Sequence, residues 1–153
     1  MKFDLITGIF PAQIKRGIFR HEDLILVLTT RRLILLPLKK VMEKSREGDD
    51  DQQAEIAGIP ILKSEELERM AKGDKPLVVE VESEGLNRLV EDLSGRSISL
   101  SDILNARVIL KDKTLTVTHR DGTERLNINS SRKDLRELKE QLKALLGERY
   151  KGR

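Results

Sequence analysis

The chain has 153 residues, of which 38% are hydrophobic and 36% charged, with no cysteine and a formal net charge of +3. This length fits one domain, and the lack of cysteine excludes disulfide scaffolds, cysteine-ligated metal sites and thiol nucleophiles. The longest apolar runs, Leu24–Leu28 and Leu33–Leu38, are far shorter than the ~18–20 residues that span a bilayer. No apolar signal segment follows Met1, so we expect a cytoplasmic protein. The high charge and the aromatic content of 3% would also suit a thermophile.

The charge is distributed unevenly along the chain. Residues 1–40 hold 8 Lys/Arg and 3 Asp/Glu, residues 41–95 hold 7 and 15, and residues 96–153 hold 14 and 8. One interpretation is that each segment simply solvates its own surface. The other is that the two basic flanks form one surface and the acidic middle is a separate insertion.

The first third of the chain is typical of β-strands. Strands are expected at Gln13–Arg20, Asp23–Leu28 and Arg32–Leu38, and the run Leu24–Leu28 is apolar on both faces, as a strand covered on both sides would be. Two apolar runs around Thr29-Thr30-Arg31-Arg32 predict a hairpin.

The middle of the chain, about residues 41–95, is predicted to be an acidic insertion. Residues 41–53 are rich in charge and predict a solvated loop. A short helix is expected from Ser64 to Gly73, a half-buried strand over residues 77–82, and a second helix from Ser83 to Gly95.

The last third predicts a meander followed by a helix. Ile98 and Leu100 alternate with serines, Leu104, Ala106, Val108 and Leu110 are expected on one strand face, and Asp121-Gly122 is a hairpin signal. A helix over residues 132–146 should be capped by Ser131, closed by Gly147 and buried along its leucine stripe. The class is α+β.

This order of elements resembles the prokaryotic PH-like and GRAM-type domains of the pleckstrin-homology-like superfamily. The resemblance is carried by Leu26–Leu35 with its Thr-x-x-Arg turn, by Ile98–Ile103, and by the Asp121-Gly122 hairpin with the helix after it. It implies a single PH-like domain over residues 1–153, built as a bent antiparallel β-barrel of about seven strands with a C-terminal capping helix and a helical insertion. The tryptophan that many of these domains carry in the terminal helix is missing, and Lys15, Arg16 and Arg20 do not match the family's phosphoinositide pattern.

Few residues could carry catalysis. His21 and His119 are the only histidines, no glycine-rich phosphate loop exists, and Asp49-Asp50-Asp51 lacks the spacing of a calcium loop. We therefore expect no enzyme, no cofactor and no metal site, and predict a non-catalytic interaction module for a protein or peptide partner. The alternatives are peripheral binding to an anionic membrane through a basic face, with Phe3, Ile9, Phe10 and Phe19 as the candidate apolar anchors, and nucleic-acid binding, which the scarcity of aromatic residues disfavours.

The candidate binding residues are cations of the first hairpins. Arg31 and Arg32 occupy the turn of the family-like motif, and they could form an anion-binding rim together with four further cations: Lys15, Arg16, Lys39 and Lys40. The competing interpretation gives Arg31 and Arg32 purely structural roles, one as a turn donor and the other as a strand residue with its aliphatic stem packed down.

Overall fold

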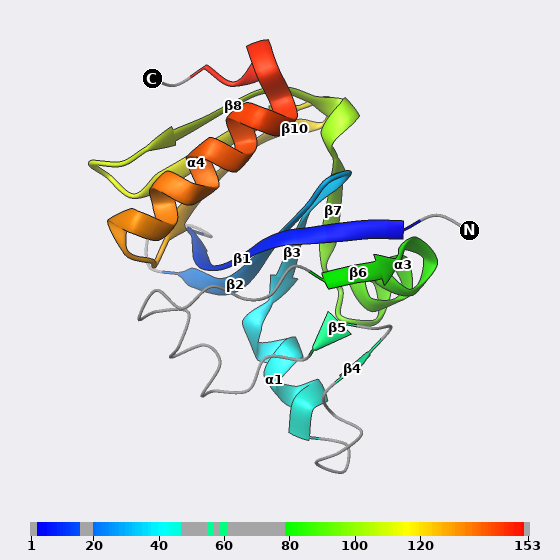
Figure 1. The fold of residues 1–153 in the computed structure, drawn as a ribbon. Coiled ribbons are helices and arrows are strands. Elements are labelled where there is room, and N and C mark those ends of the chain that lie inside the picture. The colour runs from blue at the N-terminus through cyan, green and yellow to red at the C-terminus, as the bar shows by residue number, and fades with distance from the viewer. Residues whose placement is uncertain (1–2, 16–19, 47–54, 57–58, 61–78, 152–153) are drawn as a thin grey trace.

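The computed structural model describes residues 3–15, 20–46, 55–56, 59–60 and 79–151. It is an α+β structure in which a bent antiparallel sheet carries helices on both sides (Figure 1). The strands are β1 (Phe3–Lys15), β2 (His21–Thr29), β3 (Arg32–Pro37), β4 (Glu55–Ile56), β5 (Ile59–Pro60), β6 (Val79–Glu82), β7 (Arg96–Ser99), β8 (Ile103–Ile109), β9 (Thr114–His119) and β10 (Gly122–Ile128). The helices are α1 (Leu38–Arg46), α3 (Ser83–Asp92) and α4 (Arg132–Leu146), with the short 3-10 turns η1 (Leu100–Asp102) and η2 (Gly147–Arg149).

The main sheet is open, so the expected closed barrel is wrong. Its strands follow the order β7-β3-β2-β1-β10-β9-β8, and β6 pairs with the first four residues of β1. Within the described residues no ladder joins the two end strands, β7 and β8, although only η1 separates them in the chain. The fold therefore keeps the seven-strand path and the terminal helix that were predicted, without hydrogen-bonded closure.

The β1–β3 layer separates two hydrophobic cores, because its strands alternate their side chains between two covered faces. Leu26 and Leu28 of β2 belong to the core under α4, while Ile25 and Val27 belong to the core under α1 and α3. This confirms the prediction that residues 24–28 are covered on both sides. Gly95 allows the chain to pass close to β3 just before β7 begins, since a Cβ at this position would lie only 2.7 Å from the Leu35 carbonyl oxygen.

Two predictions for the first half differ from the structure. The first strand covers Phe3–Lys15 instead of Gln13–Arg20, because it pairs with β2 along nine positions and with β6 at its beginning. Residues 38–46 form a helix, α1, where the end of a strand at Leu38 and a loop from residue 41 were expected, since Leu38 and Val41 pack into the second core. The acidic segment is thus partly structural: it supplies α1, β6 and α3, whereas the expected helix at Ser64–Gly73 lies outside the described residues.

The meander β8–β10 confirms the predicted strands, but Leu104 does not share the buried face of β8 as predicted. A bulge between Ile103 and Asn105 turns Leu104 outward, where it is 55% exposed, while Ala106 and Val108 stay buried. The β9–β10 turn consists of Arg120 and Asp121, and Gly122, with φ +146°, already pairs with His119.

Helix α4 covers the inner face of the meander and of β1. Ser131 Oγ accepts the Asp134 N–H at 3.2 Å, Gly147 ends the helix with φ +58°, and a leucine stripe is buried beneath it, as the sequence predicted: Leu135, Leu138, Leu142 and Leu146. Gln141 fixes the helix to β1, because its Nε2 donates to the Thr7 carbonyl oxygen at 3.0 Å.

No helix in the described part of the chain combines the length and apolar character that crossing a membrane requires.

Candidate functional site

The turn between β2 and β3 is held by one buried threonine. Thr29 Oγ1 accepts the backbone N–H groups of Arg31 at 3.1 Å and Arg32 at 3.0 Å, and it donates to Asp4 Oδ1 at 2.9 Å. The main chain that carries both arginines is therefore fixed to the beginning of β1.

Asp4 forms the centre of a polar cluster next to this turn. Its carboxylate is 1% exposed, accepts the Ser83 hydroxyl at 2.7 Å and makes an ion pair with Arg32 Nη2 at 2.9 Å. The Arg32 guanidinium also donates to the Ser83 carbonyl oxygen at 3.0 Å and to Asn87 Oδ1. Burial by itself raises the pKa of Asp4, but the hydrogen bonds from Arg32, Ser83 and Thr29, with the Arg32 charge, outweigh it and hold that pKa below its usual value.

An open groove of about 520 Å³ lies over this cluster, and we call it the Arg31 groove. Its lining comes from β1, the β2–β3 turn, α3, β7 and η1: Asp4, Arg31, Arg32, Ser83, Asn87, Ser97, Ser99 and Asp102. Asp4 and Arg32 neutralise one another, and Asp102 lies 3.4 Å from Arg120. Within the described residues, the exposed Arg31 is therefore the lining cation that makes no ion pair. The lining itself thus holds two arginines and two aspartates, and a third arginine, Arg120, pairs with Asp102 from outside it, so the groove is a polar surface with several hydroxyl groups and one cation more than its carboxylates.

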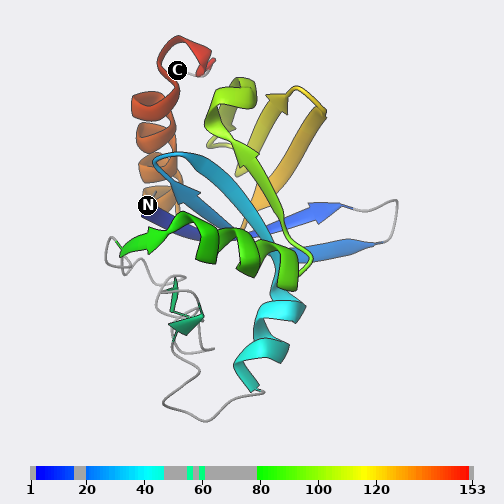
Figure 2. The ribbon, with the colours of Figure 1, turned by 90° about the vertical axis from the view of Figure 1, so that its right-hand side faces the viewer.

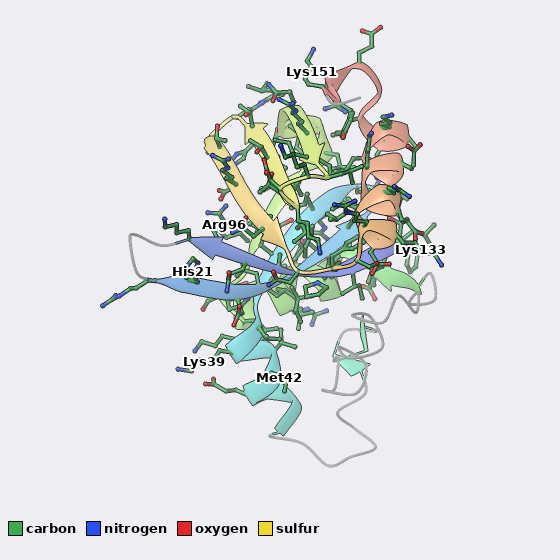
Figure 3. The ribbon with its side chains drawn as sticks, turned by 90° about the vertical axis from the view of Figure 1, so that its left-hand side faces the viewer. His21, Lys39, Met42, Arg96, Lys133 and Lys151 are labelled. Atoms are coloured by element: carbon green, nitrogen blue, oxygen red, sulfur yellow. The ribbon has the colours of Figure 1, made fainter. Side chains whose placement is uncertain are left out.

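The structure does not gather the six predicted cations at one place. Arg31 and Arg32 share the turn that follows β2, whereas Lys39 and Lys40 lie in the first turn of α1, beyond the opposite end of β3. Figure 3 shows Lys39 on that helix. Lys15 is exposed at the end of β1, and Arg16 lies outside the described residues. Of the two arginines, Arg32 is engaged in an ion pair with Asp4, which neither interpretation predicted, and Arg31 is exposed to solvent.

The serine, asparagine and aspartate lining of the groove was not predicted as a site. Asp4 is 28 residues from Arg32 and 79 from Ser83 in the chain, so no local pattern joins them. The one available signal was the alternation Arg96–Ser99, which places the polar Ser97 and Ser99 on the opposite face from Ile98.

The remaining sequence candidates fall into surface, core or paired positions. His21 is exposed at the start of β2, and His119 lies at the end of β9, where its Nδ1 accepts the Asp121 N–H at 3.2 Å and its Nε2 is 3.5 Å from Glu124 Oε1. Ile9 and Phe10 are buried in the cores and are therefore wrong as membrane anchors, whereas Phe3 is 46% exposed. Phe19 is outside the described residues.

In the described ranges, no three His, Asp or Glu side chains gather as a metal site would require. The chemistry available at the groove is hydrogen bonding and charge pairing, which a recognition surface needs.

In comparisons with known proteins, the chain matches no family model and no curated sequence.

Proposed function

We propose that this protein is a non-catalytic interaction module that binds an acidic segment of a partner protein in the Arg31 groove. The observation that carries the proposal is the exposed Arg31 guanidinium on a turn fixed by Thr29 and by the Asp4–Arg32 pair. A guanidinium is a planar donor suited to carboxylates, and a rigid backbone lowers the entropy lost on binding.

The neighbouring hydroxyl and amide groups support the same partner. Ser97 and Ser99 are exposed on β7, and Asn87 of α3 lines the same groove, so a bound peptide would find uncharged donors and acceptors beside the cation. The groove has little apolar lining, and this favours a polar segment over an apolar helix or small molecule.

We also propose that the architecture is an open form of the PH-like fold. Support comes from the order of a long first strand, two hairpins, a meander and a terminal helix whose buried leucines cover the inner face of the sheet. A solved structure of this chain whose strand order departs from that path would contradict this assignment.

Binding of a fluorescent hexaglutamate peptide tests the proposed function. Arg31→Gln should weaken the affinity roughly tenfold at low salt, about 1.4 kcal/mol, because a charge-assisted hydrogen bond is lost. Arg136→Gln removes the same charge from an exposed position of α4 and should leave the affinity unchanged.

Equal affinities for the parent and the Arg31→Gln variant would contradict the proposal, provided that the variant keeps the parent's melting temperature. Binding to anionic vesicles that depends on Phe3 and not on Arg31 would favour the membrane alternative instead, because Phe3 is the exposed aromatic residue of β1.

A further inference from the structure

The outer face of the meander is a second polar surface, separate from the groove. Leu115, Val117 and Leu126 point inward to the core under α4, so the alternate residues point outward. Figure 2 shows α4 on one side of β9 and β10 and no helix of the described chain on the other. We call this surface the meander face; its outward positions are Asn105, Arg107, Ile109, Thr114, Thr116, Thr118, Thr123, Arg125 and Asn127.

Two arginines on this face lie in one cross-strand row. Arg107 and Arg125 both pair with Thr116, one from β8 and the other from β10. Since neighbouring strands are about 4.8 Å apart, the two arginines start roughly 10 Å from one another with a hydroxyl between them. Both are exposed, and among the described residues neither pairs with a carboxylate.

Further cations surround this row. Lys111 and Lys113 are exposed in the β8–β9 turn, and Lys113 lies next to β10, because its carbonyl oxygen accepts the Ile128 N–H at 2.8 Å. Lys15 is exposed on the same side of β1 as Gln13, the residue that pairs with Asn127 of β10.

Acidic groups are fewer there. Asp112 lies in the turn, and Asp23 accepts a hydrogen bond from Gln13 Nε2 at 3.1 Å. Glu124 has the inward parity of Leu126 and is engaged with Arg96 and His119. Among these residues five cations face two carboxylates, and the β9–β10 turn adds one charge of each sign, Arg120 and Asp121.

We propose that the meander face binds the phosphate backbone of double-stranded nucleic acid without reading its sequence. Arginine, lysine, threonine and asparagine are the side chains that contact backbone phosphates, and all four kinds occur on or beside this row. The surface carries no aromatic side chain, so it lacks the stacking groups that single strands require. Its centre also carries no exposed apolar anchor for a membrane, because the exposed Leu104 lies at the bulge that begins β8 and the half-buried Ile109 lies at the other end of that strand.

The test is the salt dependence of binding to a labelled 20-base-pair duplex of mixed sequence, measured with the full chain. Each neutralised phosphate contributes about −0.9 to the slope of log Kobs against log salt, so three or four contacts predict a slope near −3 to −4. The double variant Arg107→Gln, Arg125→Gln should reduce that slope by about 2 and weaken binding on the order of 100-fold at 50 mM salt.

The matched control is Arg132→Gln, Arg136→Gln, which removes the same charge from exposed positions of α4 and should retain the parent's slope. An equal loss in both double variants would overturn the proposal, because net charge and not the meander face would then govern binding. Absence of duplex binding at 50 mM salt would overturn the proposal. So would a result in which Arg107→Gln, Arg125→Gln loses binding to anionic vesicles but keeps the parent's affinity for the duplex. Because Arg31 lies on another surface, the hexaglutamate result and this one can fail independently.

Discussion

Asp4 is the residue whose ionisation should couple stability to pH. Its pKa is lowered in the folded protein, since the Arg32, Ser83 and Thr29 hydrogen bonds outweigh its burial. A carboxyl with a lowered folded pKa contributes stability above its unfolded pKa, about 3.9, and loses it as the pH falls through the folded pKa. We expect Asp4→Asn to reduce the free energy of unfolding by about 3 kcal/mol at pH 7, because Arg32 is left without its counter-charge.

The measurement is urea unfolding of the parent and Asp4→Asn from about pH 7 to pH 2. The difference between them should stay constant down to about pH 4 and narrow below it, as the parent carboxylate becomes protonated. Asp112→Asn is the control, since this carboxylate lies exposed in a turn. If the difference in free energy of unfolding between the parent and Asp4→Asn does not change with pH, the destabilisation comes from packing and not from charge.

The same residue shows why the groove could be predicted only in part. Arg31 and Arg32 were identified from a turn motif of four residues, Thr29-Thr30-Arg31-Arg32, and both line the groove in the structure. Their partners come from β1 and from the β6–α3 junction, and only the pairing of β6 with β1 brings Ser83 beside Asp4. Contacts of that sequence separation leave no periodic signal in the chain.

The docking of helix α4 on the sheet should depend on its buried leucine stripe. Leu138 is fully buried under the helix, so Leu138→Ala should cost about 3 kcal/mol through lost burial and a cavity. Lys139→Ala, one residue on and half-exposed, should change stability by less than about 0.5 kcal/mol. Thermal and urea unfolding measure both, and equal small losses would mean that the helix is not docked on the sheet.

Elements were predictable where local pattern and burial agree. The stripe, Ser131 cap and terminal Gly147 of α4 lie within 17 consecutive residues, and the structure confirms them. The helix at residues 38–46 was missed because its polar side chains outnumber the apolar ones, and only packing of Leu38 and Val41 on the sheet accounts for it. The bulge at Leu104 was missed because one extra residue shifts the alternation without changing the composition.

Arg149 and Tyr150, which follow α4, tie that helix to β8 and to the corner between β7 and β8. Arg149 Nη1 donates to the carbonyl oxygens of Leu100 at 2.6 Å and Ile103 at 3.0 Å, and Tyr150 Oη accepts the Val108 N–H at 3.1 Å. The Arg149 contacts lie at the corner where the two end strands diverge, and the Tyr150 contact lies further along β8. Together they brace an opening that no strand ladder closes in the described part of the chain.

Arg149→Gln should therefore destabilise the whole fold and not only its end. Two partly buried carbonyl oxygens lose a charged donor, which predicts a loss of about 2 kcal/mol in the free energy of unfolding. Arg132→Gln removes the same charge at the exposed start of α4 and should cost less than about 0.5 kcal/mol. Amide hydrogen exchange locates the effect: exchange through global opening should accelerate together in β2 and β9, about 30-fold for 2 kcal/mol, because the two cores share the β1–β3 layer. Acceleration confined to residues 147–151, with an unchanged unfolding midpoint, would mean that the corner holds without this arginine.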